Sequence, residues 1–220
     1  MRVHFLLVCE GASDGALVPH LRSLLVDCGA REATGTAPDF GQLGQRVSRD
    51  IGTRVRVALQ LEGHVDLLFV HRDADSPDPE RRYDEISRGL AQVGYANAWI
   101  GVVPVQETEA WLLLDESAIR RVSGHPRGRV VLNLPSPSHV EELAKPKERL
   151  LGEIVRASET TGRKRDRLKQ KLPSLRAQLL AKLKLGGPLQ DVPSWVRLRT
   201  DVKNYVEGQL ATLSPPRGLV

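Results

Sequence analysis

Cysteine and aromatic residues are scarce in this chain of 220 residues. Cys9 and Cys28 are too few for a disulfide framework, so we expect a protein of the reducing cytoplasm with an ordinary buried thiol at Cys9. Aromatic residues make up 4% of the chain, which argues against a platform on which single-stranded nucleic acid stacks. Charge would therefore have to supply any affinity for nucleic acid.

Long apolar runs and paired metal-binding histidines are missing as well. The opening apolar stretch, residues 3–9, is far too short to span a membrane, runs straight into Glu10 and has no signal-peptide cleavage pattern. We therefore expect no membrane association. The histidines show no paired zinc spacing, so we assign none of them to a metal: His4, His20, His64, His71, His125 and His139.

Two apolar runs end in acidic residues. Residues 3–9 lead into Glu10, and residues 65–71 lead into Asp73 and Asp75. Both runs are typical of buried parallel strands, and ligands gather outside the carboxyl ends of strands in an open α/β sheet. Carboxylates that meet there repel one another unless a cation or a proton joins them, and carboxylate oxygens suit Mg²⁺. The sequence therefore predicts that Glu10, Asp73 and Asp75 bind Mg²⁺ or Mn²⁺.

The same acids also have ordinary structural interpretations. Glu10 could interact with a helix dipole, and Asp73 and Asp75 could cap the turn before Pro77. If the backbone is extended, however, side chains two residues apart point the same way and could share one ion.

A third predicted strand, residues 96–105, ends shortly before Glu107 and Glu109. In extended backbone these two acids would also point the same way, and either could bind a second metal ion. Alternatively they open the helix that ends near Asp115, because acids are favourable in the first turn of a helix.

Basic residues dominate the later part of the chain. The net charge of the full chain is +5. Lys147 lies at a predicted helix start, where it could neutralise charge on a transferring phosphoryl group or simply be solvated. The densest run, residues 163–171, could contact the phosphate backbone of nucleic acid or form an exposed helix face. Its predicted contact residues are Arg163, Lys164, Arg165, Arg167, Lys169 and Lys171.

The pattern of elements predicts an α/β protein with a mostly parallel sheet flanked by helices and a helical C-terminal lobe. We place a metal-binding α/β core at residues 1–123, a helical basic lobe at residues 124–213 and a flexible tail at residues 214–220. Helices are predicted in the lobe at residues 138–143, 146–157, 166–185 and 194–210, the third of them interrupted or kinked at Pro173. In the core, helices are predicted at residues 14–28, 42–61 and 79–93.

The strand followed by Glu10-Gly11 and Ser13-Asp14 resembles the opening of the Toprim domain of topoisomerases, primases and some nucleases. The Asp-x-Asp of Asp73 and Asp75 resembles the second signature of that domain. Residues 104–115 and 145–150 look like the later motifs of a small Toprim-like group, domain-of-unknown-function family 4276, which is akin to the nuclease half of overcoming-lysogenization-defect proteins. The resemblance covers roughly residues 1–210.

This resemblance implies a Mg²⁺-dependent nuclease that hydrolyses phosphodiester bonds in DNA or RNA, regulated by an ATPase partner and acting in defence against phage. Asp73 and Asp75 would bind metal, Glu10 would bind metal or act as a general base, and Glu107 or Glu109 would complete a second site. Strand passage is not expected, because no tyrosine lies in a nucleophile motif. The alternatives are a non-catalytic subunit that binds nucleic acid or a partner, and a metal-dependent phosphohydrolase of small substrates.

Overall fold

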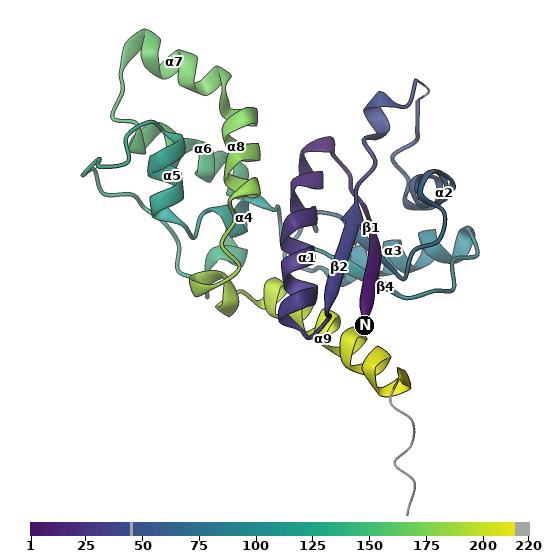
Figure 1. Cartoon of the computed structure of the whole chain (residues 1–220). Helices are drawn as coiled ribbons and strands as arrows, with labels where there is room; N and C mark the ends of the chain where they lie inside the picture. The colour runs from purple at the N-terminus through teal and green to yellow at the C-terminus, as the bar shows by residue number, and fades with distance from the viewer. Residues whose placement is uncertain (45, 214–220) are drawn as a thin grey trace, which may run out of the picture. The chain divides into compact units, whose positions relative to one another are not determined.

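The computed structural model describes residues 1–44 and 46–213, and these residues separate into two compact units (Figure 1). Unit 1 consists of Met1–Val70, Ile86–Val102 and the described part of Arg197–Val220, and unit 2 consists of His71–Glu85 and Val103–Val196. This division differs from the predicted boundary at residue 123, because His71–Glu85 groups with the later segment and the end of the chain groups with the earlier one. The predicted tail, residues 214–220, lies outside the described residues.

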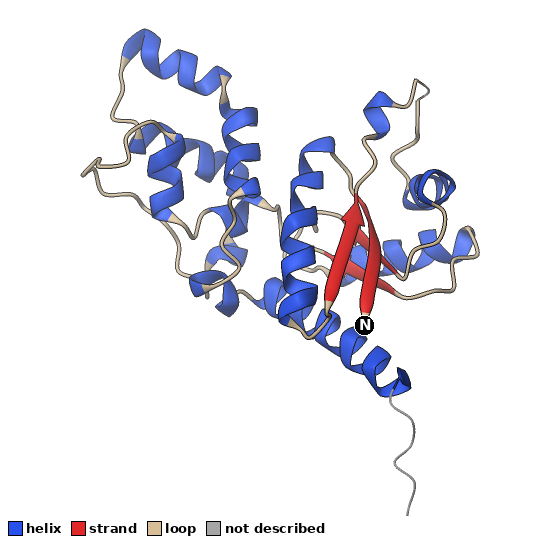
Figure 2. Cartoon of the chain, in the orientation of Figure 1, coloured by secondary structure: helices blue, strands red, loops and turns tan. Residues whose placement is uncertain are grey.

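A parallel sheet forms the centre of unit 1 (Figure 2). Within the described residues its order is β2-β1-β3-β4, in which β1 is Arg2–Val8, β2 is Glu32–Thr36, β3 is Leu67–His71 and β4 is Trp99–Val102. The central strands β1 and β3 pair in parallel, and the side chains of β3 are all buried. The predicted α/β class, with a parallel sheet flanked by helices and with helices toward the C-terminus, is confirmed.

Apolar stripes on the helices cover this sheet. The 3₁₀ helix η1 (Ala12–Leu17) precedes α1, and the covering helices are α1 (Val18–Asp27), α2 (Ile51–Glu62), α3 (Glu80–Gln92) and α9 (Pro193–Leu213). Unit 1 includes α3 from Ile86 onward and α9 from Arg197 onward. In the core of unit 1, Phe5 and Phe69 meet edge to face with their ring centroids 5.3 Å apart. Such pairs add stability beyond the area that they bury.

The largest difference from the predicted elements of unit 1 is the start of α2. A helix was expected from residue 42, but the chain forms only a 3₁₀ turn, η2 (Phe40–Gln42), and α2 begins at Ile51. The side chain of Asp50 accepts a hydrogen bond of 2.8 Å from the backbone N of Thr53, so Asp50 is the N-cap. The apolar spacing before Asp50 therefore belongs to a loop.

Unit 2 is helical. Its elements are α4 (Glu109–Leu112), α5 (Glu116–Val122), η3 (Val140–Glu142), α6 (Pro146–Ala157), α7 (Gly162–Gln170), α8 (Leu172–Ala181) and η4 (Gly187–Asp191). The rings of Trp111 and Trp195 meet edge to face in its core, and the indole N–H of Trp111 donates to Ser194 Oγ at 3.0 Å. The helix predicted at residues 166–185 is interrupted as expected, since Pro173 lies in the first turn of α8.

The predicted buried thiol is confirmed. Cys9 is buried, and both Cys9 and Cys28 are free thiols. Burial raises the pKa of the Cys9 thiol well above its usual range, so this side chain is an unreactive core residue. In the part of the chain that the structure describes, every helix is too short or too polar to cross a bilayer.

Two helical glycines give a matched test of the packing in unit 1. A Cβ at Gly89 of α3 would lie 2.8 Å from Cβ of Ile51 in α2, whereas a Cβ at Gly208 of α9 would meet nothing within 4 Å. We expect Gly89→Ala to lower the free energy of unfolding by about 1–3 kcal/mol through overpacking. Gly208→Ala should raise it by up to about 1 kcal/mol through helix propensity. Urea unfolding of both variants measures this, and equal effects would contradict the close approach of α2 and α3.

Candidate carboxylate site

Asp73 is held by Thr108 in unit 2. Thr108 donates to Asp73 Oδ1 from its backbone N at 2.8 Å and from its hydroxyl at 2.7 Å. Because the hydroxyl proton is used in this way, the 3.0 Å hydrogen bond between His71 Nε2 and Thr108 Oγ1 must be donated by the imidazole. These hydrogen bonds therefore place a proton on Nε2 of His71 and fix the orientation of the Asp73 carboxylate. Asp73 Oδ2 has no hydrogen-bond partner among the described residues.

Backbone hydrogen bonds between two loop segments create this arrangement. Ala74 N donates to Pro104 O at 3.0 Å, Asp75 N donates to Gln106 O at 2.9 Å, and Gln106 N donates to Ser76 O at 3.3 Å. The residues that follow β3 are thereby tied to the residues that precede α4. This pairing brings Asp73, Glu107 and Glu109 together in unit 2, where the charge of Glu109 raises the pKa of Asp73 and of Glu107.

Asp75 does not share the extended backbone that would align it with Asp73. Its φ is +52°, in the left-handed region that aspartate tolerates better than most residues. Its carboxylate is 63% exposed and pairs with Arg82 at 2.7 Å, and Arg82 also pairs with Glu85. The predicted metal ligand Asp75 is therefore engaged by a cation of its own unit.

Glu107 caps the start of α6. Its Oε2 accepts a hydrogen bond of 2.8 Å from the backbone N of Lys147, while Oε1 has no hydrogen-bond partner within the described residues. Burial raises the pKa of Glu107, and the charges of Glu109 and Asp73 raise it further, against the opposing effect of Lys147. The predicted site residue Lys147 thus meets the cluster through its backbone as well as its charge.

Glu109 is the first residue of α4, so the helix-opening interpretation of this acid is confirmed. It is 3% exposed, and its Oε1 accepts a hydrogen bond of 2.7 Å from Nε of Arg176 in α8. Removing one partner of such a buried pair typically costs about 3–5 kcal/mol, because the other charge is left uncompensated. Arg176 therefore compensates Glu109, whose negative charge still acts on Asp73 and Glu107. The role of Glu109 as a metal ligand stays a prediction.

The cluster as a whole opposes its own ionisation. Burial raises the pKa of Asp73, the charge of Glu109 raises it further, and His71 together with the Thr108 hydrogen bonds lowers it. Asp73 and Glu107 therefore both hold protons more tightly than isolated carboxyl groups. The ionised forms of Asp73 and Glu107 are therefore less favourable here than those of isolated carboxyl groups.

The donor atoms suit a hard cation, although they do not enclose one. Among the described residues, no group of three or more His, Cys, Asp and Glu side chains could hold a metal ion as the side chains stand. Mg²⁺ is usually bound by one or two carboxylates, with water and substrate phosphates as the other ligands. Asp73 Oδ2 and Glu107 Oε1 are the carboxylate oxygens of this cluster that could supply that smaller number of ligands.

Glu10 belongs to unit 1, where it follows β1, while Asp73 belongs to unit 2. The backbone O of Glu10 accepts a hydrogen bond of 2.7 Å from Nη1 of Arg54, and the same nitrogen donates to the backbone O of Cys9. The convergence of Glu10 with Asp73 and Asp75 stays a prediction.

The predicted basic surface forms α7 and the residue after it. No residue of α7 is buried, and its basic residues take part in no ion pair within the described chain. Arg163, Lys164, Arg165, Arg167, Lys169 and Lys171 are all exposed. This exposure agrees equally with a phosphate-contact surface and with a solvated helix face.

Sequence reasoning missed three residues that shape the site. Thr108 lies between the two glutamates and carried a detectable signal, since a hydroxyl beside paired acids often donates to one of them. His71 ends β3 and was set aside because it lacks zinc spacing. Arg176 is far away in sequence, and only the fold brings it to Glu109.

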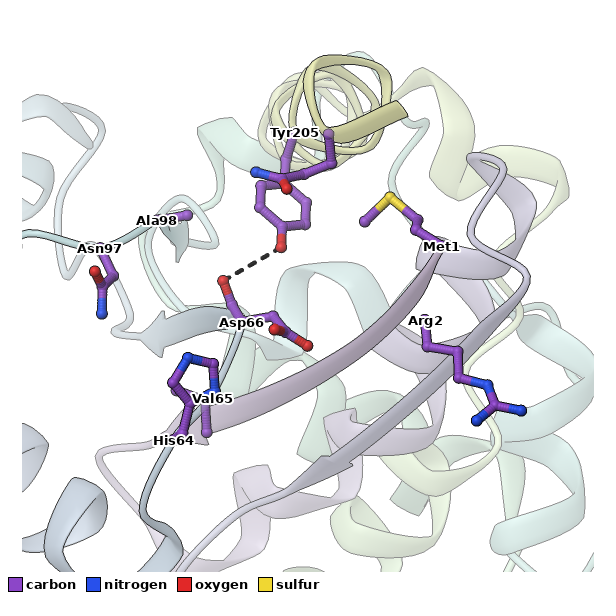
Figure 3. A pocket seen from close by; sticks show the side chains of 9 residues that line it. Met1, Arg2, His64, Val65, Asp66, Asn97, Ala98 and Tyr205 are labelled. Carbon is purple, nitrogen blue, oxygen red and sulfur yellow. Dashed lines mark hydrogen bonds between the residues drawn. The ribbon is translucent and has the colours of Figure 1, made fainter. Parts of the chain in front are cut away.

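A polar hollow of about 350 Å³ lies elsewhere in unit 1, at the amino ends of the strands (Figure 3). The hydroxyl of Tyr205 on α9 donates to the backbone O of Asp66 there at 3.2 Å, and burial raises the Tyr205 pKa to about 12. Ligands of parallel sheets gather at the opposite, carboxyl ends of the strands. We therefore interpret this hollow as the place where α9 meets the sheet.

Comparison of the chain with protein-family models, with curated proteins and with solved structures finds no match. The resemblance to Toprim domains therefore rests on the motifs of the sequence itself and stays a prediction.

The raised pKa of Asp73 predicts a specific pH dependence. Stability owed to the proton on Asp73 is fully present below its unfolded pKa, near 3.8, and is lost as pH rises through the higher folded pKa. Asp73→Asn keeps an acceptor for both Thr108 hydrogen bonds but removes the charge. We expect this variant to gain stability relative to the native protein as pH rises from about 3.8 to neutrality.

Thr108→Val serves as the opposing variant, because it removes a hydrogen bond that stabilises the ionised carboxylate. It should lose more stability at neutral pH than at pH 3. Chemical unfolding across this pH range measures both effects. Parallel pH profiles for the native protein and Asp73→Asn would contradict the raised pKa.

Proposed function

We propose that this chain is a Mg²⁺- or Mn²⁺-dependent hydrolase of phosphodiester bonds in DNA or RNA. The observation that supports it most is the pair Asp73 and Glu107. Each carboxylate has one oxygen without a hydrogen-bond partner in the described chain and a pKa raised by burial and by neighbouring acids. Bringing a divalent cation to these oxygens would relieve the repulsion that the fold builds into them.

Asp73 and Glu107 would hold the ion, which when bound lowers the pKa of water and neutralises phosphate oxygens. Thr108 keeps Asp73 in one orientation through two hydrogen bonds, and the start of α6 does the same for Glu107. Lys147, next to Glu107, supplies positive charge for a substrate phosphate. Glu10 keeps its predicted role as a further ligand or as the general base, and the experiment below tests it separately.

The exposed basic surface on α7 supports a polyanionic substrate. No residue of α7 is buried, and its basic side chains are exposed and can meet a partner. Its unpaired cations can neutralise backbone phosphates without reading the sequence of bases. An ATPase partner and a role against phage remain parts of the proposal that rest on the family resemblance.

A non-catalytic subunit that binds nucleic acid or a partner is the second candidate. The side chains of the described residues do not enclose a metal ion as they stand, and Arg176 and Arg82 already pair with Glu109 and Asp75. A protein that kept the fold but lost the chemistry would show these neutralised acids.

Metal-dependent stabilisation and hydrolysis test the proposal together. Mn²⁺ should raise the melting temperature of the native protein, because a ligand that binds only the folded state stabilises it. Asp73→Asn should abolish this shift, whereas Glu116→Gln, on the exposed start of α5, should keep it. Asp75→Asn shows whether the predicted third ligand participates.

With Mn²⁺ and a DNA or RNA substrate, Asp73→Asn should lower the rate by more than about 100-fold, since even outer partners of metal ligands cost about 10–100-fold. Glu10→Gln should lower the rate while binding persists. Activity that survives in both variants would point to another site or a contaminant. Binding without turnover, with and without an added ATPase, would favour the second candidate.

A further inference from the structure

An arginine-lined cavity of about 490 Å³ lies in unit 1, in the loop that leads into α2. Its lining residues are Arg46, Val47, Ser48, Arg49 and Arg54. It therefore brings together three guanidinium groups and a hydroxyl with no acidic residue in its lining. Guanidinium groups stay protonated at every physiological pH, so the cavity is permanently positive.

Arg54 is the fixed member of this group. It is 7% exposed, its Nε donates to the backbone O of Ser48 at 3.2 Å, and its Nη1 donates to the backbone O of Cys9 and Glu10. Its guanidinium also lies 4.8 Å from the centre of the Phe40 ring. These contacts hold one positive charge in a defined position at the cavity.

Arg46 and Arg49 are exposed residues of the same loop. The loop precedes the N-terminus of α2, whose dipole adds positive potential. The acid nearest in sequence, Asp50, is engaged in capping α2 through Thr53 and does not line the cavity. The residues that line the cavity therefore include no acid.

We propose that this cavity binds a phosphate group, and that in the proposed function the phosphate belongs to the backbone of the bound nucleic-acid strand. Planar guanidinium groups match the oxygens of phosphate with paired hydrogen bonds, a geometry that a chloride ion cannot offer. Arg54 lines the cavity and also holds the backbone of Glu10. A phosphate bound beside Arg54 would therefore lie next to a side chain that also holds the turn of Glu10, the predicted general base.

The assignment of the phosphate to a strand rests on the proposed function, whereas phosphate binding itself does not. Binding is therefore measured with the full chain in EDTA, where no metal-dependent step takes place. The first probe is inorganic phosphate, which replaces chloride at constant ionic strength. Calorimetry measures its binding. The second is a fluorescent single-stranded oligonucleotide of mixed sequence, titrated at several salt concentrations.

Arg46→Ala combined with Arg49→Ala is the test variant, because both side chains are exposed and Arg54 keeps its structural contacts. Arg56→Ala is the matched control, an exposed arginine of α2 outside the cavity. The double variant should weaken inorganic phosphate binding at least about tenfold, as the loss of charge-assisted hydrogen bonds implies. Its oligonucleotide affinity should show a salt slope shallower by about one unit per lost contact. The control should keep the native values.

Absence of saturable phosphate binding by the native protein would overturn the proposal, as would equal losses in the double variant and in Arg56→Ala. Loss of phosphate binding with an unchanged oligonucleotide salt slope would overturn the assignment to a strand. A chain that binds phosphate as expected but hydrolyses nothing would refute the proposed hydrolase and leave this site in place.

Discussion

Two hydrogen bonds from Thr108 hold Asp73 in place, and the candidate site depends on them. They form because the segment after β3 pairs with the segment before α4, through Ala74, Pro104 and Gln106. The same pairing brings Glu107 and Glu109 near Asp73, where the charge of Glu109 raises the pKa values of both Asp73 and Glu107. A local backbone interaction therefore determines where the negative charge of unit 2 collects.

Stability alone does not account for this arrangement. Arg176 compensates Glu109, but Asp73 Oδ2 and Glu107 Oε1 accept no hydrogen bond from the described residues. The raised pKa values mean that ionising these groups at neutral pH costs folding free energy. Natural proteins accept such costs mainly at functional sites, where binding of a ligand recovers them. Unit 1 carries groups of the opposite charge in the cavity lined by Arg46, Arg49 and Arg54.

The buried strands and the acids after them could be predicted from the sequence, because continuous apolar runs between turn signals specify central parallel strands. The position of Asp75 could not, since its left-handed backbone follows from a loop pairing between residues distant in sequence. The pairing of Glu109 with Arg176 depends on how α4 and α8 pack. The start of α2 was misjudged because an apolar spacing continued past Asp50, whose capping hydrogen bond is a stronger local signal. The basic run was found from sequence, although neither sequence nor exposure reveals what it contacts.

The central claim is that burial and neighbouring charge raise the pKa values of Asp73 and Glu107, and that a bound divalent cation stabilises their ionised forms. Carbon-13 titration of the side-chain carboxyl groups, with Asp73 and Glu107 assigned through single substitutions, measures this directly. Without a divalent cation both pKa values should lie above those of exposed acids, and saturating Mg²⁺ should lower both while leaving Glu116 unchanged. Titration curves for Asp73 and Glu107 that do not move when Mg²⁺ is added would contradict the account.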